Sequence, residues 1–131
     1  MSEDKYKKKL SKEQYHILRE RGTESAFSGK HDKNIQKGTY HCAACGAPLF
    51  KSNSKYDSGT GWPSFSDSIK SNIKTKLDFS LVLPQKEVIC KKCGSHLGHV
   101  FNDGPRPTGK RYCINSLSLD FKKSKNIKKP K

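Results

Sequence analysis

Long apolar segments are missing from this sequence. Only 31% of its 131 residues are hydrophobic, and the longest purely aliphatic run is Leu81-Val82-Leu83. A membrane-spanning helix requires about 20 mostly apolar residues, and no segment resembles the apolar part of a signal peptide. We therefore expect a cytoplasmic protein without a membrane span. The length fits one domain with a small core, so an additional cross-link is expected to stabilise the fold.

Acidic residues are scarce as well. The 12 Asp and Glu residues stand against 27 Lys and Arg residues, which gives a net charge of +15. The two ends carry much of it: residues 1–12 contribute +3 and residues 122–131 contribute +6. Lysine-rich ends are typical of solvated tails, whose affinity for polyanions is non-specific and salt-sensitive. We expect a basic tail over residues 1–10, one domain over 11–121 and a lysine-rich tail over 122–131, without nucleic-acid binding as the main function.

The pattern of apolar residues favours strands over most of the chain. A capping box formed by Ser11 and Gln14 predicts a short helix that runs to about residue 21 and is ended by Gly22. Beyond it, β-branched and aromatic residues lie between clusters of Gly, Asn, Asp and Pro, which is typical of strands and turns. The expected strands cover residues 38–42, 78–83, 86–89 and 112–121, with long loops over residues 51–77 and 101–110.

Four of the five cysteines form two short motifs. Cys42-Ala-Ala-Cys45 and Cys90-Lys-Lys-Cys93 are each followed directly by glycine. Two residues between the cysteines let both thiolates of one tight turn bind the same ion, and glycine permits the positive φ of such a turn. Structural zinc contributes an apparent ~10–16 kcal/mol to folding, far more than the cost of closing the long loop between the motifs. We predict one structural zinc ion held by all four cysteines. A redox Cys-x-x-Cys motif and buried free thiols are the alternatives.

The fifth cysteine, Cys113, lies in the sequence Arg111-Tyr-Cys-Ile-Asn115. On a strand, alternation places Arg111, Cys113 and Asn115 on one face, which continues as Leu117, Leu119 and Phe121. A neighbouring guanidinium favours the nucleophilic thiolate, and an amide can orient a polar substrate. The alternative is a cysteine that serves only to pack the interior.

Two other segments contain residues suited to chemistry. His96 and His99 follow the second cysteine pair directly, and two histidines within four positions suggest general acid catalysis, although either alone is more often structural. Trp62, the only tryptophan, lies between Gly61 and Pro63 in a Gly- and Ser-rich segment that is expected to be a loop. A tryptophan held there can form an apolar wall against a methyl or thioether group.

Four sequence blocks together closely resemble methionine-R-sulfoxide reductases. They are Gly22-Thr-Glu24, Gly61-Trp62-Pro-Ser-Phe65, Ser95-His96-Leu-Gly-His99-Val-Phe-Asn-Asp103-Gly-Pro and Arg111-Tyr-Cys113-Ile-Asn115-Ser. The resemblance covers about residues 10–121, and the two cysteine pairs fall between the blocks as in zinc-containing members. It implies a mainly β fold of two antiparallel sheets with short N-terminal helices, and reduction of methionine R-sulfoxide in oxidised proteins or as the free amino acid.

The resemblance also implies roles for individual residues. Cys113 would be the nucleophile, and Trp62 would hold the methyl group of the substrate. His96, His99 and Asn115 would bind and polarise the sulfoxide, with Arg111 and Asp103 in support. A sulfoxide sulfur is a poor electrophile until its oxygen is protonated or hydrogen-bonded, so a thiolate next to an acid is chemically reasonable. Attack would leave Cys113 as a sulfenic acid.

The sequence departs from the common family pattern at Thr60. Many members have a resolving cysteine at this position, two residues before the tryptophan, and threonine cannot form a disulfide. With four cysteines bound to zinc, no thiol remains to react with the oxidised Cys113. We therefore expect thioredoxin or a small thiol to reduce Cys113 directly.

Two other functions fit parts of the sequence. A zinc-ribbon module that binds nucleic acid or a partner protein would explain the cysteine pairs and the basic ends, but not Trp62, the two histidines or Cys113. The second alternative is an enzyme that performs a different thiol chemistry on the same zinc scaffold. In each case we expect a monomer.

Overall fold

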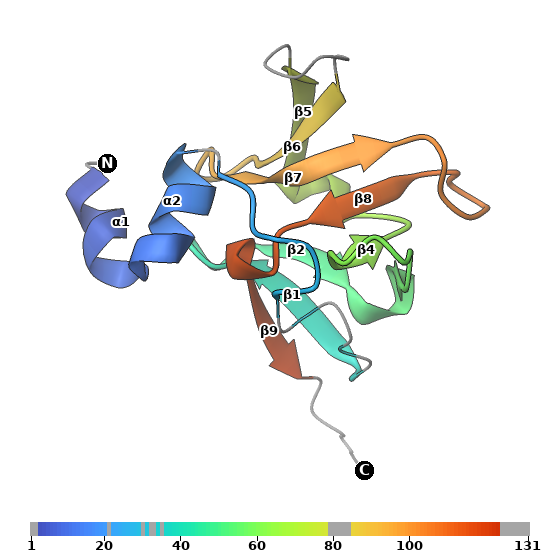
Figure 1. The fold of residues 1–131 in the computed structure, drawn as a ribbon, viewed down its shortest axis with the longest axis horizontal. Coiled ribbons are helices and arrows are strands. Elements are labelled where there is room, and N and C mark those ends of the chain that lie inside the picture. Colours follow the sequence, from blue (N-terminus) through green and yellow to red (C-terminus); the bar gives the residue numbers. More distant parts are fainter. Residues whose placement is uncertain are drawn as a thin grey trace.

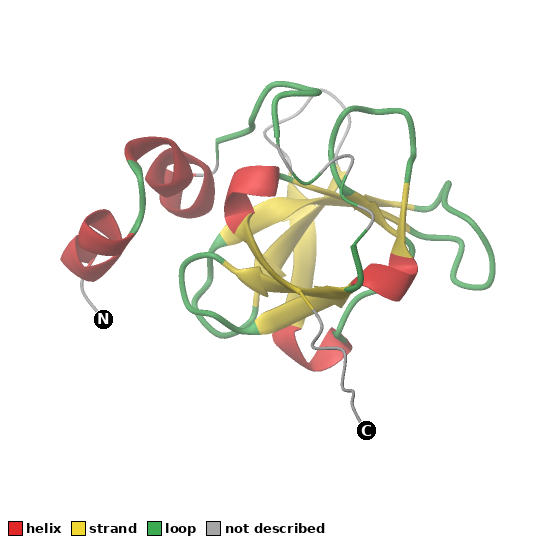
Figure 2. Cartoon of the chain, turned by 90° about the horizontal axis from the view of Figure 1, so that it is seen from below, coloured by secondary structure: helices red, strands yellow, loops and turns green. Residues whose placement is uncertain are grey.

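The computed structural model contains two short helices and two antiparallel sheets (Figure 1). The residues that the structure describes are 3–20, 22–29, 31, 34, 36–78 and 85–123. The helices α1 (Glu3–Lys9) and α2 (Lys12–Glu20) lie together at one side of the sheets (Figure 2). The expected fold class, mainly β with two antiparallel sheets and short N-terminal helices, is confirmed. Neither described helix is long and apolar enough to cross a membrane.

The smaller sheet has three strands in the order β2-β1-β9, and the larger sheet has six in the order β3-β4-β8-β7-β6-β5. The strands of the smaller sheet are β1 (Gly38–Cys42), β2 (Pro48–Lys51) and β9 (Leu119–Lys123). Those of the larger sheet are β3 (Lys55–Tyr56), β4 (Ser64–Phe65), β5 (Ile73–Asp78), β6 (Gln85–Cys90), β7 (His96–Phe101) and β8 (Arg111–Ile114). Three short 3-10 helices connect them: η1 (Ser52–Ser54), η2 (Lys70–Asn72) and η3 (Ser116–Ser118).

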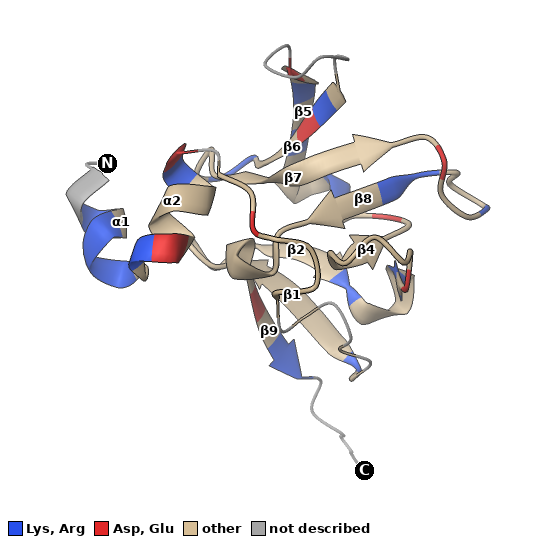
Figure 3. Cartoon of the chain, in the orientation of Figure 1, with Lys and Arg blue, Asp and Glu red and all other residues tan. Residues whose placement is uncertain are grey.

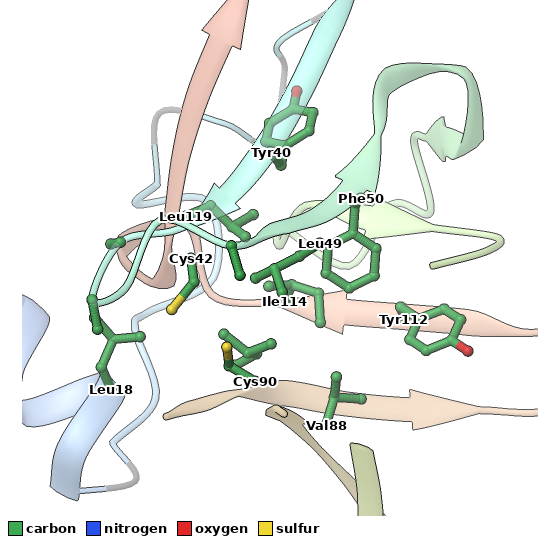
Figure 4. Close-up of a cluster of buried hydrophobic side chains, with 14 of the residues drawn as sticks. Leu18, Tyr40, Cys42, Leu49, Phe50, Val88, Cys90, Tyr112, Ile114 and Leu119 are labelled. Atoms are coloured by element: carbon green, nitrogen blue, oxygen red, sulfur yellow. The ribbon is translucent and has the colours of Figure 1, made fainter. Parts of the chain in front are cut away.

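The core lies between the two sheets. Phe50 of β2 stacks on Phe65 of β4 with ring centroids 4.4 Å apart, so aromatic packing joins the two sheets directly. Ile114 of β8 lies beside Phe50 and Leu49 in the same cluster (Figure 4). Since these side chains are almost fully buried, their burial is the main apolar contribution to the stability of the domain.

The capping box at the start of α2 is confirmed. The Ser11 hydroxyl accepts a hydrogen bond from the Gln14 backbone N–H at 3.1 Å, and the Ser11 backbone N–H donates to Gln14 Oε1 at 3.0 Å. At the other end, the Gly22 N–H donates to the His16 carbonyl at 3.0 Å. These bonds satisfy backbone groups that a short helix would otherwise leave unpaired at its ends.

Residues 3–9, expected to belong to a basic tail, form helix α1 instead. Tyr6 and Leu10 are buried, with exposed fractions of 3% and 7%. The Arg19 guanidinium of α2 lies 4.4 Å from the centre of the Tyr6 ring, a cation–π contact. The lysines dominate the charge of this segment, but the two apolar residues give the helix a face to bury. Residues 124–131 of the expected C-terminal tail lie outside the described residues.

Some strand predictions are confirmed and others are not. β1 matches the expected strand 38–42, and β6 extends the expected strand 86–89 by one residue at each end. Of the expected strand 78–83, only Asp78 is described, and it ends β5. The prediction of a loop over residues 51–77 is wrong, because the segment contains β3, β4 and most of β5. Strands of two residues, such as β3 and β4, are too short to produce a recognisable alternation.

The prediction of one strand over residues 112–121 is also wrong. β8 ends at Ile114, and η3 separates it from β9, which pairs with β1 in the other sheet. The Ser118 N–H donates to the Asn115 carbonyl at 3.0 Å, which closes the turn that carries the chain from one sheet to the other. Leu119 and Phe121 therefore do not continue the face of Cys113.

Candidate active site and metal centre

Cys113 lies on a central strand of the larger sheet. In β8 it is paired with Ser64 of β4 on one side and with His99 of β7 on the other. Gly98 allows β7 to approach closely, because a Cβ atom there would lie 2.0 Å from the Cys113 carbonyl oxygen. Three segments far apart in the sequence are thus brought together at one cysteine.

A cavity of about 350 Å³ opens beside Cys113, a size typical of small-molecule sites. Five of the seven residues predicted for catalysis and substrate binding line it: Trp62, His99, Arg111, Cys113 and Asn115. His96 and Asp103 are not among its lining residues, which also include Thr23, Thr60, Gln85, Gly98 and Phe101. The prediction that Arg111, Cys113 and Asn115 share a face is confirmed.

Three polar groups contact the sulfur atom of Cys113. Nη1 of Arg111 donates a hydrogen bond to Sγ at 3.1 Å. The hydroxyl oxygens of Thr60 and Ser64 lie 3.5 Å and 3.8 Å from Sγ. A sulfur surrounded by a cation and hydroxyl groups can carry negative charge, which favours the nucleophilic form of a cysteine. Neither hydroxyl contact was predicted from the sequence.

The guanidinium of Arg111 is held in place by two partners. Asp103 accepts two hydrogen bonds from it, from Nε at 2.8 Å and from Nη2 at 3.1 Å. The Phe101 ring lies below it, with Cζ 4.3 Å from the ring centre. The Arg111 guanidinium holds the pKa of Asp103 below its usual range, and the hydrogen bonds that Arg111 donates to Asp103 raise the pKa of Arg111. Asp103 thus affects Cys113 through the orientation of Arg111.

The two histidines share a face because of a β-bulge. The partners of Val88 and Ile89 in β7 are Gly98 and His96, so Leu97 is an extra residue in that strand. Without it, strand alternation would place His96 and His99 on opposite faces. The bulge instead brings their rings together, with centroids 5.6 Å apart.

Each histidine is paired with a carboxylate from another strand of the larger sheet, Asp78 from β5 and Glu87 from β6. Nε2 of His99 lies 3.0 Å from Oδ2 of Asp78, at the cavity. Nδ1 of His96 lies 2.7 Å from Oε2 of Glu87, and both of these side chains are buried. A carboxylate next to an imidazole fixes the orientation of the ring. Neither acid was predicted from the sequence, because no motif surrounds Asp78 or Glu87.

Trp62 and Asn115 are held by the backbone of Glu24. The Trp62 indole N–H donates to the Glu24 carbonyl at 3.0 Å, and the Glu24 N–H donates to Asn115 Oδ1 at 3.0 Å. Nδ2 of Asn115 donates one hydrogen bond to the Leu97 carbonyl at 3.1 Å. An amide nitrogen carries two hydrogens, so the second can be donated to a molecule in the cavity.

The four remaining cysteines form one cluster between the sheets. Their sulfur atoms all lie within 4.8 Å of one another, with Cys42 and Cys93 at 3.7 Å and Cys45 and Cys90 at 3.6 Å. Two sulfurs on one tetrahedral zinc ion would be about 3.8 Å apart. The Cys42 and Cys90 sulfurs point toward each other across the core (Figure 4). The predicted gathering of these cysteines is confirmed, and the glycines that follow the pairs have positive φ, +84° at Gly46 and +78° at Gly94.

Close contact makes the ionisation of these thiols interdependent. The hydrogen bonds that Cys42 donates to Cys90 and Cys93 raise the pKa of Cys42, whereas the hydrogen bonds that Cys93 accepts, first from Cys42, lower its pKa. Like charges this close disfavour one another, so four thiolates cannot coexist here without a cation. The cluster therefore fits a metal ion and gives it a closed set of sulfur ligands.

The helices contribute one cation to each cysteine pair. Lys9 Nζ donates to the Ala44 carbonyl in the first turn at 2.8 Å. Arg19 Nη1 donates to the Cys93 carbonyl at 2.7 Å and to the Ser95 hydroxyl at 3.1 Å. A divalent ion with four thiolates has two excess negative charges, which two nearby cations would offset.

The model of the SelR domain family matches residues 10–123 of the chain. A peptide methionine sulfoxide reductase MsrB from Methanosarcina barkeri is 60% identical over 122 residues, which cover 92% of this chain and 86% of the relative. A protein of the same name from Leptospira interrogans is 59% identical, and the matched region covers 93% of this chain and 94% of that relative. The mitochondrial methionine-R-sulfoxide reductase B2 of Rattus norvegicus is 53% identical, and the matched region covers 95% of this chain and 76% of that relative.

The fold also resembles a solved structure with a different name. The Mis18 'Yippee-like' domain superimposes with a TM-score of 0.54 at 19% sequence identity, over 70% of this chain and all of that domain. At this identity the similarity concerns the fold alone.

Glu24 offers a test of how the cavity is supported. Its Oε1 accepts a hydrogen bond from the Leu117 N–H at 3.0 Å. Glu24→Ala should lower the free energy of unfolding by about 1–3 kcal/mol, because this N–H loses its partner, and should change the fluorescence of Trp62. Glu24→Gln keeps an acceptor oxygen and should therefore lower the free energy of unfolding by less. Urea unfolding followed by Trp62 fluorescence measures both, with exposed Glu20→Ala as the control. Equal midpoints for Glu24→Ala and Glu20→Ala would contradict the anchoring role of Glu24.

Proposed function

Since the chain belongs to the SelR family and is an enzyme that reduces methionine R-sulfoxide to methionine, we propose that Cys113 supplies the attacking thiolate. The observation that carries this proposal is the position of Cys113 in the cavity, where Arg111 donates a hydrogen bond to its sulfur at 3.1 Å. The other four cysteines lie in the separate cluster between the sheets. Cys113 is therefore the cysteine placed to react with a molecule in the cavity.

The reaction transfers one oxygen atom. The Cys113 thiolate attacks the sulfoxide sulfur, and the oxygen passes to Sγ with uptake of one proton. Methionine leaves with its sulfur reduced by two electrons, and the Cys113 sulfur is oxidised by the same two electrons. Cys113 becomes a sulfenic acid, the first reversible step of cysteine oxidation. Arg111, oriented by Asp103, stabilises the thiolate before the attack.

We assign the acid that acts on the sulfoxide oxygen to His99. Its ring lines the cavity, and Asp78 holds Nε2. His96 lies behind it as a positioning residue, with its ring against that of His99 and its Nδ1 at Glu87. Asn115 donates the second hydrogen of its amide to the same oxygen. Trp62 forms the apolar side of the cavity, where the methyl group of the substrate binds.

Zinc is the metal that we propose for the four-cysteine cluster. Four sulfur ligands complete a tetrahedral shell and leave no open position for a substrate. The ion would supply structural support, since its ligands come from the turns after β1 and β6 in different sheets. Lys9 and Arg19 would offset the charge of the ligands.

Regeneration of Cys113 depends on an external thiol in this proposal. Thr60 Oγ1 lies 3.5 Å from the Cys113 sulfur, where a cysteine side chain could form a disulfide. Because threonine cannot, a small thiol or a thiol of thioredoxin attacks the sulfenic acid, which releases water and forms a mixed disulfide with Cys113. A second thiol, from another small molecule or from the same thioredoxin, then attacks the mixed disulfide and releases the Cys113 thiol.

We also propose that the enzyme is a cytoplasmic monomer that acts on oxidised proteins. The alternative considered from the sequence, a zinc-ribbon module that binds nucleic acid or a partner protein, rested on the cysteine pairs and the basic residues. Lys and Arg residues occur on α1, β5 and β9, at different ends of the molecule (Figure 3). This spread gives no support to a single polyanion-binding face.

Cys113→Ser is expected to abolish turnover, because a serine hydroxyl is not ionised at neutral pH. The assay is reduction of dabsyl-methionine-R-sulfoxide with dithiothreitol, and the S epimer serves as the substrate control. Metal content and circular dichroism should stay unchanged, since Cys113 is not part of the four-cysteine cluster. Substantial turnover by the purified variant would exclude Cys113 as the nucleophile.

His99→Ala should lower kcat by about 10²- to 10⁴-fold, the usual contribution of a general acid. Asp78→Asn should cause a smaller loss, because it disturbs only the orientation of the ring. His16→Ala, in the exposed part of α2, is the control. If the loss of turnover merely follows the loss of folded protein measured by circular dichroism, His99 has a structural role only.

Metal analysis should find one zinc per chain. Removal of zinc with a chelator, or Cys42→Ser, should lower the melting temperature sharply, because binding of structural zinc contributes directly to folding. Ser71→Ala, at an exposed serine of η2, serves as the control for the substitution. A metal-free protein with an unaltered melting temperature would contradict the proposal.

After one turnover without reductant, Cys113 should remain a sulfenic acid. Trapping with dimedone and mass spectrometry should find one adduct, on Cys113, with no intramolecular disulfide and no release of zinc. A disulfide between Cys113 and a cysteine of the cluster, together with loss of zinc, would show instead that the metal site supplies the resolving thiol. Thr60→Cys should create the missing disulfide and improve thioredoxin-dependent turnover, because the contact at 3.5 Å leaves only a small rotation to disulfide geometry.

A further inference from the structure

Three hydroxyl groups beside Cys113 form a connected cluster. We propose that this hydroxyl cluster, made of Ser58, Thr60 and Ser64, holds the sulfenic acid of Cys113 and slows its further oxidation until a reductant arrives. The proposal rests on the role of Cys113 as the nucleophile, proposed above. It gives Thr60, which stands where a resolving cysteine would be, a function of its own.

Short distances connect the cluster to the sulfur at two points. Ser58 Oγ is its centre, 2.8 Å from Thr60 Oγ1 and 2.6 Å from Ser64 Oγ. Thr60 and Ser64 in turn lie 3.5 Å and 3.8 Å from the Cys113 sulfur. Ser64 is fully buried, and Ser58 and Thr60 are half-buried. The groups therefore close a ring of hydrogen-bonding atoms with Cys113 at one corner.

The direction of these hydrogen bonds follows from one carbonyl. Ser64 Oγ lies 3.1 Å from the Trp62 carbonyl oxygen, which can only accept. When Ser64 donates to it, Ser58 can donate to Ser64. The hydroxyl hydrogen of Thr60 is then free to point at Ser58 or at the Cys113 sulfur. Thr60 can thus switch between two partners without any movement of the backbone.

Such a switch matches the change that Cys113 undergoes. The thiolate can only accept, so Thr60 donates to it together with Arg111. The sulfenic acid carries an O–H group that needs an acceptor, and the Thr60 oxygen provides one when its own hydrogen turns to Ser58. A hydroxyl group both donates and accepts, so it can donate to the thiolate and accept from the sulfenic O–H, whereas a protonated amine or guanidinium can only donate.

Protection is needed because the sulfenic acid has to persist. Peroxide converts a sulfenic acid to a sulfinic acid by transfer of a second oxygen, with release of water, and this product is not restored by thiols. The sulfur of the sulfenic acid acts as the nucleophile in that step, most effectively after its O–H has lost the proton. A hydrogen bond from the O–H to Thr60 retains that proton and reduces the reactivity toward peroxide.

The test compares Thr60→Val, which keeps the shape but removes the hydroxyl, with Thr60→Ser, which keeps the hydroxyl. Each zinc-loaded protein is oxidised by one equivalent of dabsyl-methionine-R-sulfoxide without reductant and is then exposed to hydrogen peroxide. Mass spectrometry of the Cys113 peptide, with dimedone added at intervals, follows the sulfenic and sulfinic acids. Loss of one hydrogen bond should make sulfinic acid form about two- to tenfold faster in Thr60→Val, while Thr60→Ser should behave as the unaltered protein.

Ser58→Ala is a second test, because Ser58 belongs to the cluster without a direct contact to the sulfur in the described structure. It removes the alternative partner of the Thr60 hydrogen and should also accelerate sulfinic acid formation. Equal rates in all variants, or equal acceleration in Thr60→Ser and Thr60→Val, would overturn the proposal. If the unaltered protein forms no dimedone adduct on Cys113, the nucleophile assignment itself fails, and this proposal fails with it.

Discussion

The junction between the two sheets depends on four sulfur atoms within 4.8 Å of one another. Two come from the end of β1 in the smaller sheet and the turn that follows it, and two from the end of β6 in the larger sheet and the turn that follows it. Thiolates this close repel each other, so one shared cation is required for all four to be ionised. β7 begins directly after the second turn and carries both histidines. Whatever fixes the cysteine cluster therefore also fixes the start of the strand that forms one side of the cavity.

The cavity is built on paired strands rather than on loops alone. β8 lies between β4 and β7, so the backbone at Cys113 is held on both sides. The bulge at Leu97 turns His96 to the face of His99, and Gly98 lets the two strands approach. The segments with Glu24 and Trp62 reach the site from outside the sheet, and hydrogen bonds join them to each other and to Asn115. Rigid support of this kind keeps reacting groups in a productive geometry.

Charges in the site occur as pairs with separate tasks. Asp103 orients Arg111 from the rim, Asp78 holds His99 at the cavity, and the buried pair of Glu87 and His96 lies behind it. Asp103 neutralises the Arg111 guanidinium from the side that faces away from the Cys113 sulfur. Its carboxylate therefore does not compete with a thiolate for the N–H group that Arg111 donates to the sulfur. Near the sulfur itself lie the hydroxyl groups of Thr60 and Ser64, which can both donate and accept hydrogen bonds.

Local sequence was sufficient for the features that depend on spacing of a few residues. The two cysteine pairs, the capping box of α2 and the common face of Arg111, Cys113 and Asn115 are all confirmed, because turn and strand geometry within such short segments is nearly independent of the rest of the chain. The assignment of strands to sheets, the carboxylate partners of the histidines and the hydroxyl cluster were decided by tertiary structure. They depend on which strands pair and on one extra residue in β7, and pairing between distant segments is set by the packing of the whole core.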